Sequence, residues 1–196
     1  GSAVTSRVKV TVLPVIPELP ADAQPENTAF NHRVLLVDHT GTQCGYCPKM
    51  MAALKEVSET EDYHSKYYEA MAHTYTQTDP ATSSTAFSIS GFFGVTAYPT
   101  LTYNFDKSIV SSNNVEVIKQ NIDALWKSEA EAGIAAAANL ASQSVLVKAE
   151  IKAAVAGEYR INAWLLEDNI VATQAGASSS QSWMNTHNNA IRYAPV

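Results

Sequence analysis

The sequence predicts an α/β domain followed by a small antiparallel β-sheet or partial immunoglobulin-like sandwich, and three patterns carry this prediction. Residues 33–38 form a nearly continuous apolar run, which is typical of a strand buried on both faces. The apolar positions of residues 115–126 fall on one side of a helix. After Gly133, apolar and polar residues alternate in short segments separated by turns, as they do in antiparallel sheets.

Composition limits the classes of function that are open to this chain. Its 196 residues, of which 46% are hydrophobic and 16% charged, can form a buried core, so we do not expect disorder. The formal net charge of −6 argues against a nucleic-acid or anionic-membrane partner, which would favour a basic face. No apolar run approaches the roughly 18–20 residues of a membrane-spanning helix, so we expect no transmembrane span.

Residues 1–30 predict a strand and a linker ahead of the α/β domain. Three valines alternate with polar residues over residues 7–13, which favours a half-buried strand. Four of the eight prolines fall within residues 14–25 and favour an extended linker. The chain opens without a charged and then apolar leader, and Gly1-Ser2 is typical of a cloning remnant. We therefore expect a native targeting segment to be missing.

Residues 31–132 predict the α/β domain itself. The buried strand leads into a helix over about residues 44–59, whose apolar residues recur every three or four positions. Asn113, followed three residues later by Glu116, predicts the capping box of the last helix. Between these two helices, the patterns predict a strand over residues 67–75, a weak helix over residues 82–90 and a strand over residues 98–105.

Residues 133–196 predict a separate β-rich domain. Alternation over residues 145–152 is followed by strands over residues 159–166 and 170–174, with turns between them. The region is too short for a whole immunoglobulin-type sandwich of roughly 100 residues. We expect the strand over residues 7–13 or a second copy of the chain in a homodimer to complete this β-domain, or the β-domain to remain incomplete.

The two cysteines, Cys44 and Cys47, carry the most informative pattern in the sequence. They are separated by two residues at the start of a predicted helix, immediately after a buried strand. The free N–H groups and the dipole of the helix N-terminus lower the pKa of the Cys44 thiol and predict an exposed nucleophile. Cys47, one turn later, would be the resolving thiol that closes the disulfide and releases a mixed-disulfide partner.

Two other interpretations of the cysteines stay open. A Cys-x-x-Cys can be half of a zinc site, but a structural zinc site needs four ligands and the five histidines form no second paired cluster. The pair can also be an inert structural disulfide. Because a dithiol is itself a redox centre, exchange chemistry requires no cofactor, and we expect neither a cofactor nor a metal.

Two further motifs lie around the cysteines in a fixed order. Asp38 comes six residues before Cys44, at the end of the buried strand. The dipeptide Tyr98-Pro99 opens a later strand about 55 residues after the first cysteine. In this order and at this spacing, the motifs resemble the thioredoxin superfamily across residues 33–127, so the resemblance implies a thioredoxin-like fold.

The resemblance implies a role for each of these residues. Pro99 would be a cis-proline facing the disulfide, and the backbone of Tyr98 would offer an edge to a substrate peptide. Asp38 would be the buried carboxyl behind Cys47, with a raised pKa and the ability to take its proton. Tyr46, between the cysteines, would lie against the same substrate. Without the resemblance, Asp38 can be a strand-end turn residue and Pro99 an ordinary edge-strand proline.

A narrower resemblance covers most of the chain. Residues 40–48, with the tail segments 168–174 and 187–192, look like the "outer-membrane protein twenty-eight" lipoproteins of Gram-negative anaerobes. That family joins a thioredoxin-like domain to a β-domain and is exported with a lipid anchor. The resemblance implies a place in the cell envelope, in the periplasm or at the outer membrane. It also implies exported protein or peptide thiols and disulfides as substrates, and an electron-transfer partner protein.

Three polar residues outside these motifs invite site hypotheses. His187 and Arg192 lie in a strand-forming tail, where a hydrogen-bonded cluster that holds the last strand is the favoured interpretation. His39, five residues before Cys44, would lower the pKa of that thiol if it lay over it. For His39, a solvated position in a loop is the favoured interpretation.

The sequence therefore predicts a thiol–disulfide oxidoreductase or isomerase that acts on exported proteins through Cys44 and Cys47. The direction of exchange stays open, and an isomerase would need a surface for misfolded chains, which dimerisation could supply. The alternative is an envelope surface lipoprotein that uses the fold as a binding scaffold and keeps its disulfide permanently closed.

Overall fold

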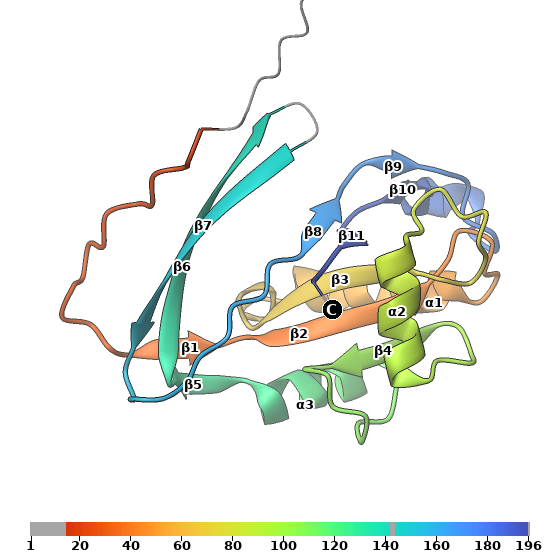
Figure 1. The fold of residues 1–196 in the computed structure, drawn as a ribbon. Coiled ribbons are helices and arrows are strands. Elements are labelled where there is room, and N and C mark those ends of the chain that lie inside the picture. Colours follow the sequence, from red (N-terminus) through yellow and green to blue (C-terminus); the bar gives the residue numbers. More distant parts are fainter. Residues whose placement is uncertain (1–14, 142–143, 196) are drawn as a thin grey trace, which may run out of the picture. The chain divides into compact units, whose positions relative to one another are not determined.

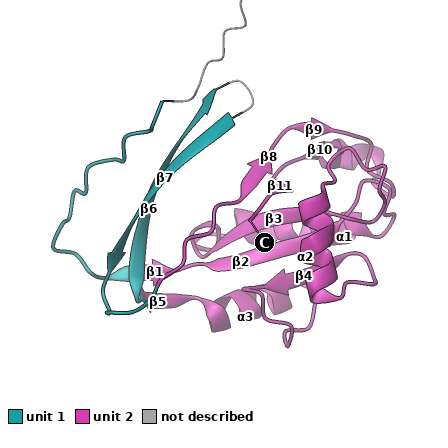
Figure 2. Ribbon diagram, in the orientation of Figure 1, with its two compact units in different colours: residues 1–30, 130–158 teal, residues 31–129, 159–196 magenta. Residues whose placement is uncertain are grey.

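The computed structural model describes residues 15–141 and 144–195, which belong to two compact units (Figure 2). The hairpin unit comprises residues 1–30 and 130–158, and the sheet unit comprises residues 31–129 and 159–196. The strand that we predicted over residues 7–13 lies outside the described residues. Each unit is described separately.

A five-stranded mixed sheet organises the sheet unit, with the strand order β4-β2-β3-β11-β8 (Figure 1). β3 runs parallel to both of its neighbours, β2 and β11, whereas the outer strands β4 and β8 are antiparallel to the strands beside them. The strands are β2 (Val34–Thr40), β3 (Tyr67–His73), β4 (Thr100–Tyr103), β8 (Leu165–Glu167) and β11 (Ala190–Tyr193).

Helices cover both faces of this sheet, as the apolar run of β2 predicts. α1 (Cys47–Glu59) and α3 (Val115–Leu125) pack on one face in a core that includes Leu36, Met50 and Ile118. α2 (Ser84–Phe93) packs on the other face, where Val37 of β2 contacts a second core. In the described part of the chain, no helix has both the length and the apolar character needed to cross a membrane.

Two helix boundaries differ from the sequence-based expectation. α1 begins at Cys47 and not near Cys44, because the preceding residues form hydrogen-bonded turns, among them one from Cys44 N–H to the Gly41 carbonyl oxygen. α3 is capped by Asn114 and not by Asn113. The remaining short elements of the sheet unit are η1 (Tyr63–Ser65), η2 (Ser179–Asn185) and the antiparallel pair β9 (Ile170–Val171) and β10 (Thr186–His187).

The region that we expected to form one β-domain, residues 133–196, is divided between the two units. Residues 159–196 return to the sheet unit, where β11 pairs with β3 and β8 pairs with β11. The strands expected over residues 159–166 and 170–174 shorten to β8 and β9. Alternation along a chain indicates a strand but not its partner, so the sequence pattern could not assign these strands to the first sheet.

The hairpin unit is built on two long strands, β6 (Ala132–Ala141) and β7 (Ser144–Ala153). They pair antiparallel, with Ile134 opposite Ile151 and Leu140 opposite Val145. Since alternate residues share a face, every residue on the side of these two pairs is apolar. The chain passes between the two units within β1 (Phe30–His32) and β5 (Lys127–Ala130), which form a two-stranded sheet.

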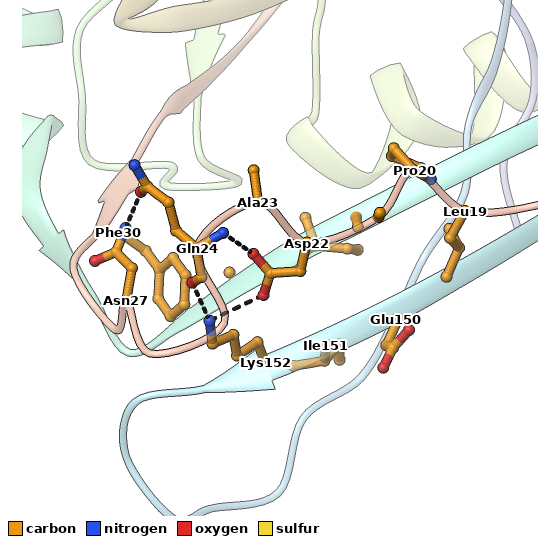
Figure 3. Close-up of a pocket in the computed structure, with 14 residues that line it drawn as sticks. Leu19, Pro20, Asp22, Ala23, Gln24, Asn27, Phe30, Glu150, Ile151 and Lys152 are labelled. Carbon is orange, nitrogen blue, oxygen red and sulfur yellow. Dashed lines mark hydrogen bonds and ion pairs between the residues drawn. The ribbon is translucent and has the colours of Figure 1, made fainter.

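An extended segment accompanies the hairpin, as the prolines of the predicted linker indicate. Residues 15–29 contain no helix or strand. Figure 3 shows Lys152 of β7 reaching to Asp22 Oδ2, at 3.0 Å, and to the Gln24 carbonyl oxygen, at 2.8 Å. At the end of the segment, Phe30 lies so close to Gly133 that a Cβ there would stand 2.4 Å from the ring, so a larger residue would require the ring to move.

The cap of α3 yields a stability prediction. Asn114 Oδ1 accepts hydrogen bonds from the N–H groups of Glu116, at 2.9 Å, and Val117, at 3.2 Å. We expect Asn114→Ala to lower the free energy of unfolding by about 1 kcal/mol in urea titrations, because two N–H groups lose their acceptor. Asn113→Ala is the matched control and should leave the urea midpoint unchanged; an equal loss in both variants would contradict the assignment.

Candidate functional site

The two cysteines lie in a loop that joins β2 to α1, which we call the cysteine loop (residues 41–47). Cys44 and Cys47 form a disulfide, with their Cα atoms 5.4 Å apart. Cys47 is the first residue of α1, and Pro48 follows it in the first turn, where a missing N–H has no cost. Cys47 therefore lies at the N-terminus of α1, and Cys44 lies in the turn that precedes the helix.

The disulfide is buried, which corrects the expectation of an exposed nucleophile. The exposed fraction is 1% for Cys44 and 0% for Cys47. Tyr46, between them, is 72% exposed. In this oxidised state, the surface of the cysteine loop presents an aromatic side chain and not a sulfur atom.

A second loop closes one side of the cysteine loop, and we call it the covering loop (residues 174–177). The Ala175 N–H donates to the Thr42 carbonyl oxygen at 2.7 Å. The side-chain Nε2 of Gln174 donates to the carbonyl oxygens of Cys44, at 3.0 Å, and Gly41, at 3.3 Å. Gln174 itself is only 3% exposed, so these bonds lie in the interior.

A glycine in the covering loop, Gly176, allows the loops to approach this closely. A Cβ on Gly176 would stand 2.3 Å from the carbonyl oxygen of Gly45, a distance that no side chain tolerates. Gly176 also has a φ of +78°, in the left-handed region that favours glycine. The contact is therefore one of backbone against backbone, and it requires glycine at position 176.

Asp38 lies on the face of the sheet that α1 covers. It follows Leu36 by two residues on β2, so both side chains point to the core shared with α1. Asp38 is fully buried, and within the described residues neither of its carboxyl oxygens has a hydrogen-bond partner. Burial raises the pKa of Asp38 well above its usual value, and the charge of Glu69 raises it further. The raised pKa makes Asp38 a stronger proton acceptor than an exposed aspartate.

The peptide bond between Tyr98 and Pro99 is cis, as the resemblance implies. β4 starts immediately after Pro99, with Thr100 opposite His39 in the antiparallel register with β2. The bond therefore lies at the edge of the sheet from which the cysteine loop departs. The Tyr98 hydroxyl donates to the Thr74 carbonyl oxygen at 3.0 Å, which anchors it to the end of β3.

Asp79 anchors the start of the cysteine loop. Its Oδ2 accepts from the Thr42 N–H at 2.6 Å and lies 3.1 Å from Nδ1 of His73, and its Oδ1 accepts from the Ala81 N–H at 2.9 Å. Burial alone would raise the pKa of Asp79, but the hydrogen bond and charge of His73 and the two N–H donors together lower it to about 2. The ionised carboxyl is thus the form that holds the loop.

The tail residues His187 and Arg192 are both hydrogen-bonded, each to its own set of partners. His187 is buried, with Nε2 3.2 Å from the Ala172 carbonyl oxygen and its ring edge-on to His73 at 5.1 Å. Arg192 donates to Glu167 Oε2 at 2.6 Å and to two carbonyl oxygens of the segment before α2. Both residues attach the C-terminal strands to the sheet unit.

The structure corrects the expectation for His39, which is neither solvated nor in a loop. β2 continues to Thr40, so His39 is the penultimate residue of a buried strand. Its Nδ1 lies 2.7 Å from Ser90 Oγ and its Nε2 3.1 Å from Thr102 Oγ1. Burial lowers the pKa of His39 to about 4, so the ring is neutral at physiological pH and supplies no charge to the thiol.

Sequence reasoning missed several residues of this site: Gln174, Gly176, Asp79, His73 and Glu69. Gln174 was expected at the end of a strand, and nothing in its neighbourhood indicated a contact 130 residues away. For Glu69 a signal existed, because an acidic residue in a predicted buried strand needs an explanation. In the described residues, no group of three or more His, Cys, Asp or Glu side chains could hold a metal ion.

Comparisons with known proteins agree with this architecture. No family model matches the sequence, and no curated protein matches it. Among solved structures, the chain is similar to HBP35 of Porphyromonas gingivalis, with a TM-score of 0.60 and 16% identity over 86% of this chain. The match covers 58% of that protein, so the chain spans less than two thirds of its length. Together, the sheet and the helices define a mixed α/β protein, and this architecture with its Cys-x-x-Cys disulfide is compatible with a thioredoxin-like fold.

The contact of Gly176 with Gly45 predicts the effect of opening the covering loop. We expect Gly176→Ala to speed reduction of the disulfide by dithiothreitol severalfold, because the added Cβ must push the two loops apart. Gly94→Ala is the matched control: its φ of +67° imposes a similar backbone strain, but a Cβ there has nothing within 4 Å. Equal reduction rates in the wild type and both variants would show that the covering loop does not limit access.

The Asp79 anchor predicts a pH dependence of stability. The folded pKa of about 2 lies below the ordinary aspartate value of 3.8, so the stabilisation is present above pH 4 and disappears as the pH falls through 2. Asp79→Asn should therefore flatten the decline of the unfolding free energy between pH 5 and pH 2, measured by urea titration. Asp62→Asn, at an exposed position, should keep the wild-type profile; a wild-type profile in Asp79→Asn would contradict the anchor.

Proposed function

We propose that the protein catalyses thiol–disulfide exchange on exported proteins or peptides. The observation that carries this proposal is the Cys44–Cys47 disulfide at the first turn of α1, on the same side of the sheet as the unpartnered buried carboxyl of Asp38. The thioredoxin-like fold of the sheet unit supports it. Structural disulfides require no proton donor, whereas exchange moves a proton each time Cys47 becomes a thiol or a thiolate.

In the exchange reaction, each residue has a defined task. A substrate thiolate attacks the Cys44 sulfur, the bond between the cysteines breaks, and Cys47 leaves as a thiolate that takes a proton from Asp38. In the reverse step, Cys47 gives its proton to Asp38 and attacks the Cys44 sulfur, and the substrate thiolate leaves. The edge at Tyr98 and Pro99 and the exposed ring of Tyr46 would position the substrate backbone.

The place of action belongs to the same proposal. The resemblance of the cysteine loop and the tail to exported lipoproteins supports a location in the cell envelope, with lipid anchoring, and protein thiols as substrates. Exchange in either direction also requires a partner protein that supplies or removes electrons, because the dithiol itself stores only one pair.

The burial of the disulfide favours a second candidate function, that of a binding scaffold. With Cys44 and Cys47 both buried, the bond in this state has the character of a structural disulfide. A protein of this kind would use its thioredoxin-like fold to bind a partner, and the cysteines would only stabilise the cysteine loop. The two functions predict different reactivities for the thiol that remains when one cysteine is replaced.

Single-cysteine variants separate these possibilities. In Cys47→Ser, we expect Cys44 to form a mixed disulfide with oxidised glutathione at least about tenfold faster than Cys47 does in Cys44→Ser, because the helix N-terminus activates the first thiol. Mass spectrometry of the time course measures both rates. Equally slow reaction of the two variants would favour the scaffold.

A further inference from the structure

A second carboxyl, Glu69, lies beside Asp38 in the interior of the sheet unit. In the parallel register of β2 and β3, Glu69 is opposite Leu36 and Met71 is opposite Asp38. Because residues opposite one another point to the same side of a sheet, Glu69 is a diagonal neighbour of Asp38 on the face that α1 covers. Acidic residues are rare in such a position, and the exchange steps at the two cysteines do not themselves require this one.

Glu69 also lines a cleft of about 380 Å³. The cleft is bounded by Met51 and Lys55 of α1 and by Trp183 of η2, as well as by residues of β3 and β10. Trp183 is 40% exposed and the side chain of Lys55 is 42% exposed, so the cleft reaches the surface. Glu69 therefore lies between the buried Asp38 and a space that water can enter.

Asp38 itself does not reach solvent. Its exposed fraction is 0%, and its neighbour Leu101 on β4 is buried and apolar. Its neighbour on β3, Met71, lines the same cleft as Glu69. Within the described residues, neither oxygen of Asp38 has a hydrogen-bond partner that could carry a proton away. A proton that arrives from Cys47 would be trapped unless a neighbouring ionisable group accepts it.

Glu69 has the acidity for this task. Burial raises the pKa of Glu69 to about 7, so the group gains and loses a proton close to physiological pH. The pKa of Asp38 is raised first by burial and then by the charge of Glu69. The charge of Glu69 therefore acts on Asp38, in agreement with their diagonal positions on β2 and β3.

We propose that Glu69 relays protons between Asp38 and the water of this cleft. The inference rests on the proposed exchange activity. When Cys47 attacks the Cys44 sulfur of the mixed disulfide, the substrate thiolate leaves. The proton of Cys47 passes to the Asp38 carboxylate, then to the Glu69 carboxylate, and then to water, so that no charge accumulates in the core. When a substrate thiolate opens the disulfide, the same path returns a proton to the leaving Cys47 thiolate.

Other ionisable groups face the cleft and must be held constant in a test. Lys55 comes from α1 and is paired with Glu59, and its ammonium lies 5.6 Å from the centre of the Trp183 ring. His187 lines the cleft from β10. Neither of these side chains is changed in the variants below.

The first experiment measures the coupling without any thiol reaction. The carboxyl carbon of Asp38 is followed by NMR during a pH titration of the oxidised protein. In Glu69→Gln, we expect the midpoint of the Asp38 titration to fall by about one pH unit, because the neighbouring negative charge is removed. Glu56→Gln on the exposed side of α1 is the matched control and should keep the wild-type midpoint.

The second experiment measures the relay. Oxidation of the reduced protein is followed at high concentrations of oxidised glutathione. Under these conditions, the attack of Cys47 on the mixed disulfide at Cys44 limits the rate. At pH 7 we expect Glu69→Gln to react about tenfold more slowly, with the difference vanishing at high pH, where hydroxide can take the proton. Glu69→Asp, which keeps a carboxyl, should restore the wild-type pH profile, which a merely structural role of the side chain would not predict.

The outcomes separate the relay from the function on which it rests. An Asp38 midpoint or a pH profile that is the same in Glu69→Gln and the wild type would overturn the relay while leaving exchange intact. A wild-type protein that does not react with oxidised glutathione would overturn the proposed function and the relay with it. A shifted midpoint together with a slowed, carboxyl-dependent rate supports the relay.

Discussion

The contact between the cysteine loop and the covering loop is the constraint on which the site depends. The amide of Gln174 donates to two carbonyl oxygens of the cysteine loop, and the backbone of Gly176 lies against Gly45. On the opposite side, Asp79 holds the Thr42 N–H. The loop that carries the disulfide is therefore fixed from two directions by segments far apart in sequence. Because both cysteines of this fixed loop are buried, access to the sulfur atoms and their reactivity are separate properties of this protein.

Beneath the disulfide, the chemistry depends on buried polar groups and not on exposed ones. The core face under α1 holds two carboxyls, Asp38 and Glu69, while the opposite face holds the neutral ring of His39 between two hydroxyl groups. An unpartnered carboxyl in an apolar core destabilises the fold unless it stays protonated. The proposed exchange would use the proton that this carboxyl binds. This reasoning connects the composition of the sheet to the exchange proposed for Cys44 and Cys47.

Much of the sheet unit could be predicted from local patterns, and the reason for each failure is physical. The apolar run of β2, the helix that begins at Cys47 and the periodic helix α3 are encoded within a few residues, so the sequence predicts them. The partners of the C-terminal strands are not local: the alternation of residues 159–196 is the same whether they form a new sheet or extend the first one. For the same reason, the spacing of the cysteines was enough to predict them as site residues. Gln174 and Gly176 could not be predicted, because they contact the cysteine loop only in the folded chain.

The equilibrium reduction potential of the Cys44–Cys47 pair tests the central claim most directly. It can be read by thiol alkylation and mass spectrometry across a series of glutathione buffers. Exchange-competent dithiols lie between about −120 and −270 mV, and the account predicts a value in this range. A potential below about −300 mV would mean a structural disulfide, and it would contradict thiol–disulfide exchange as the function of this protein.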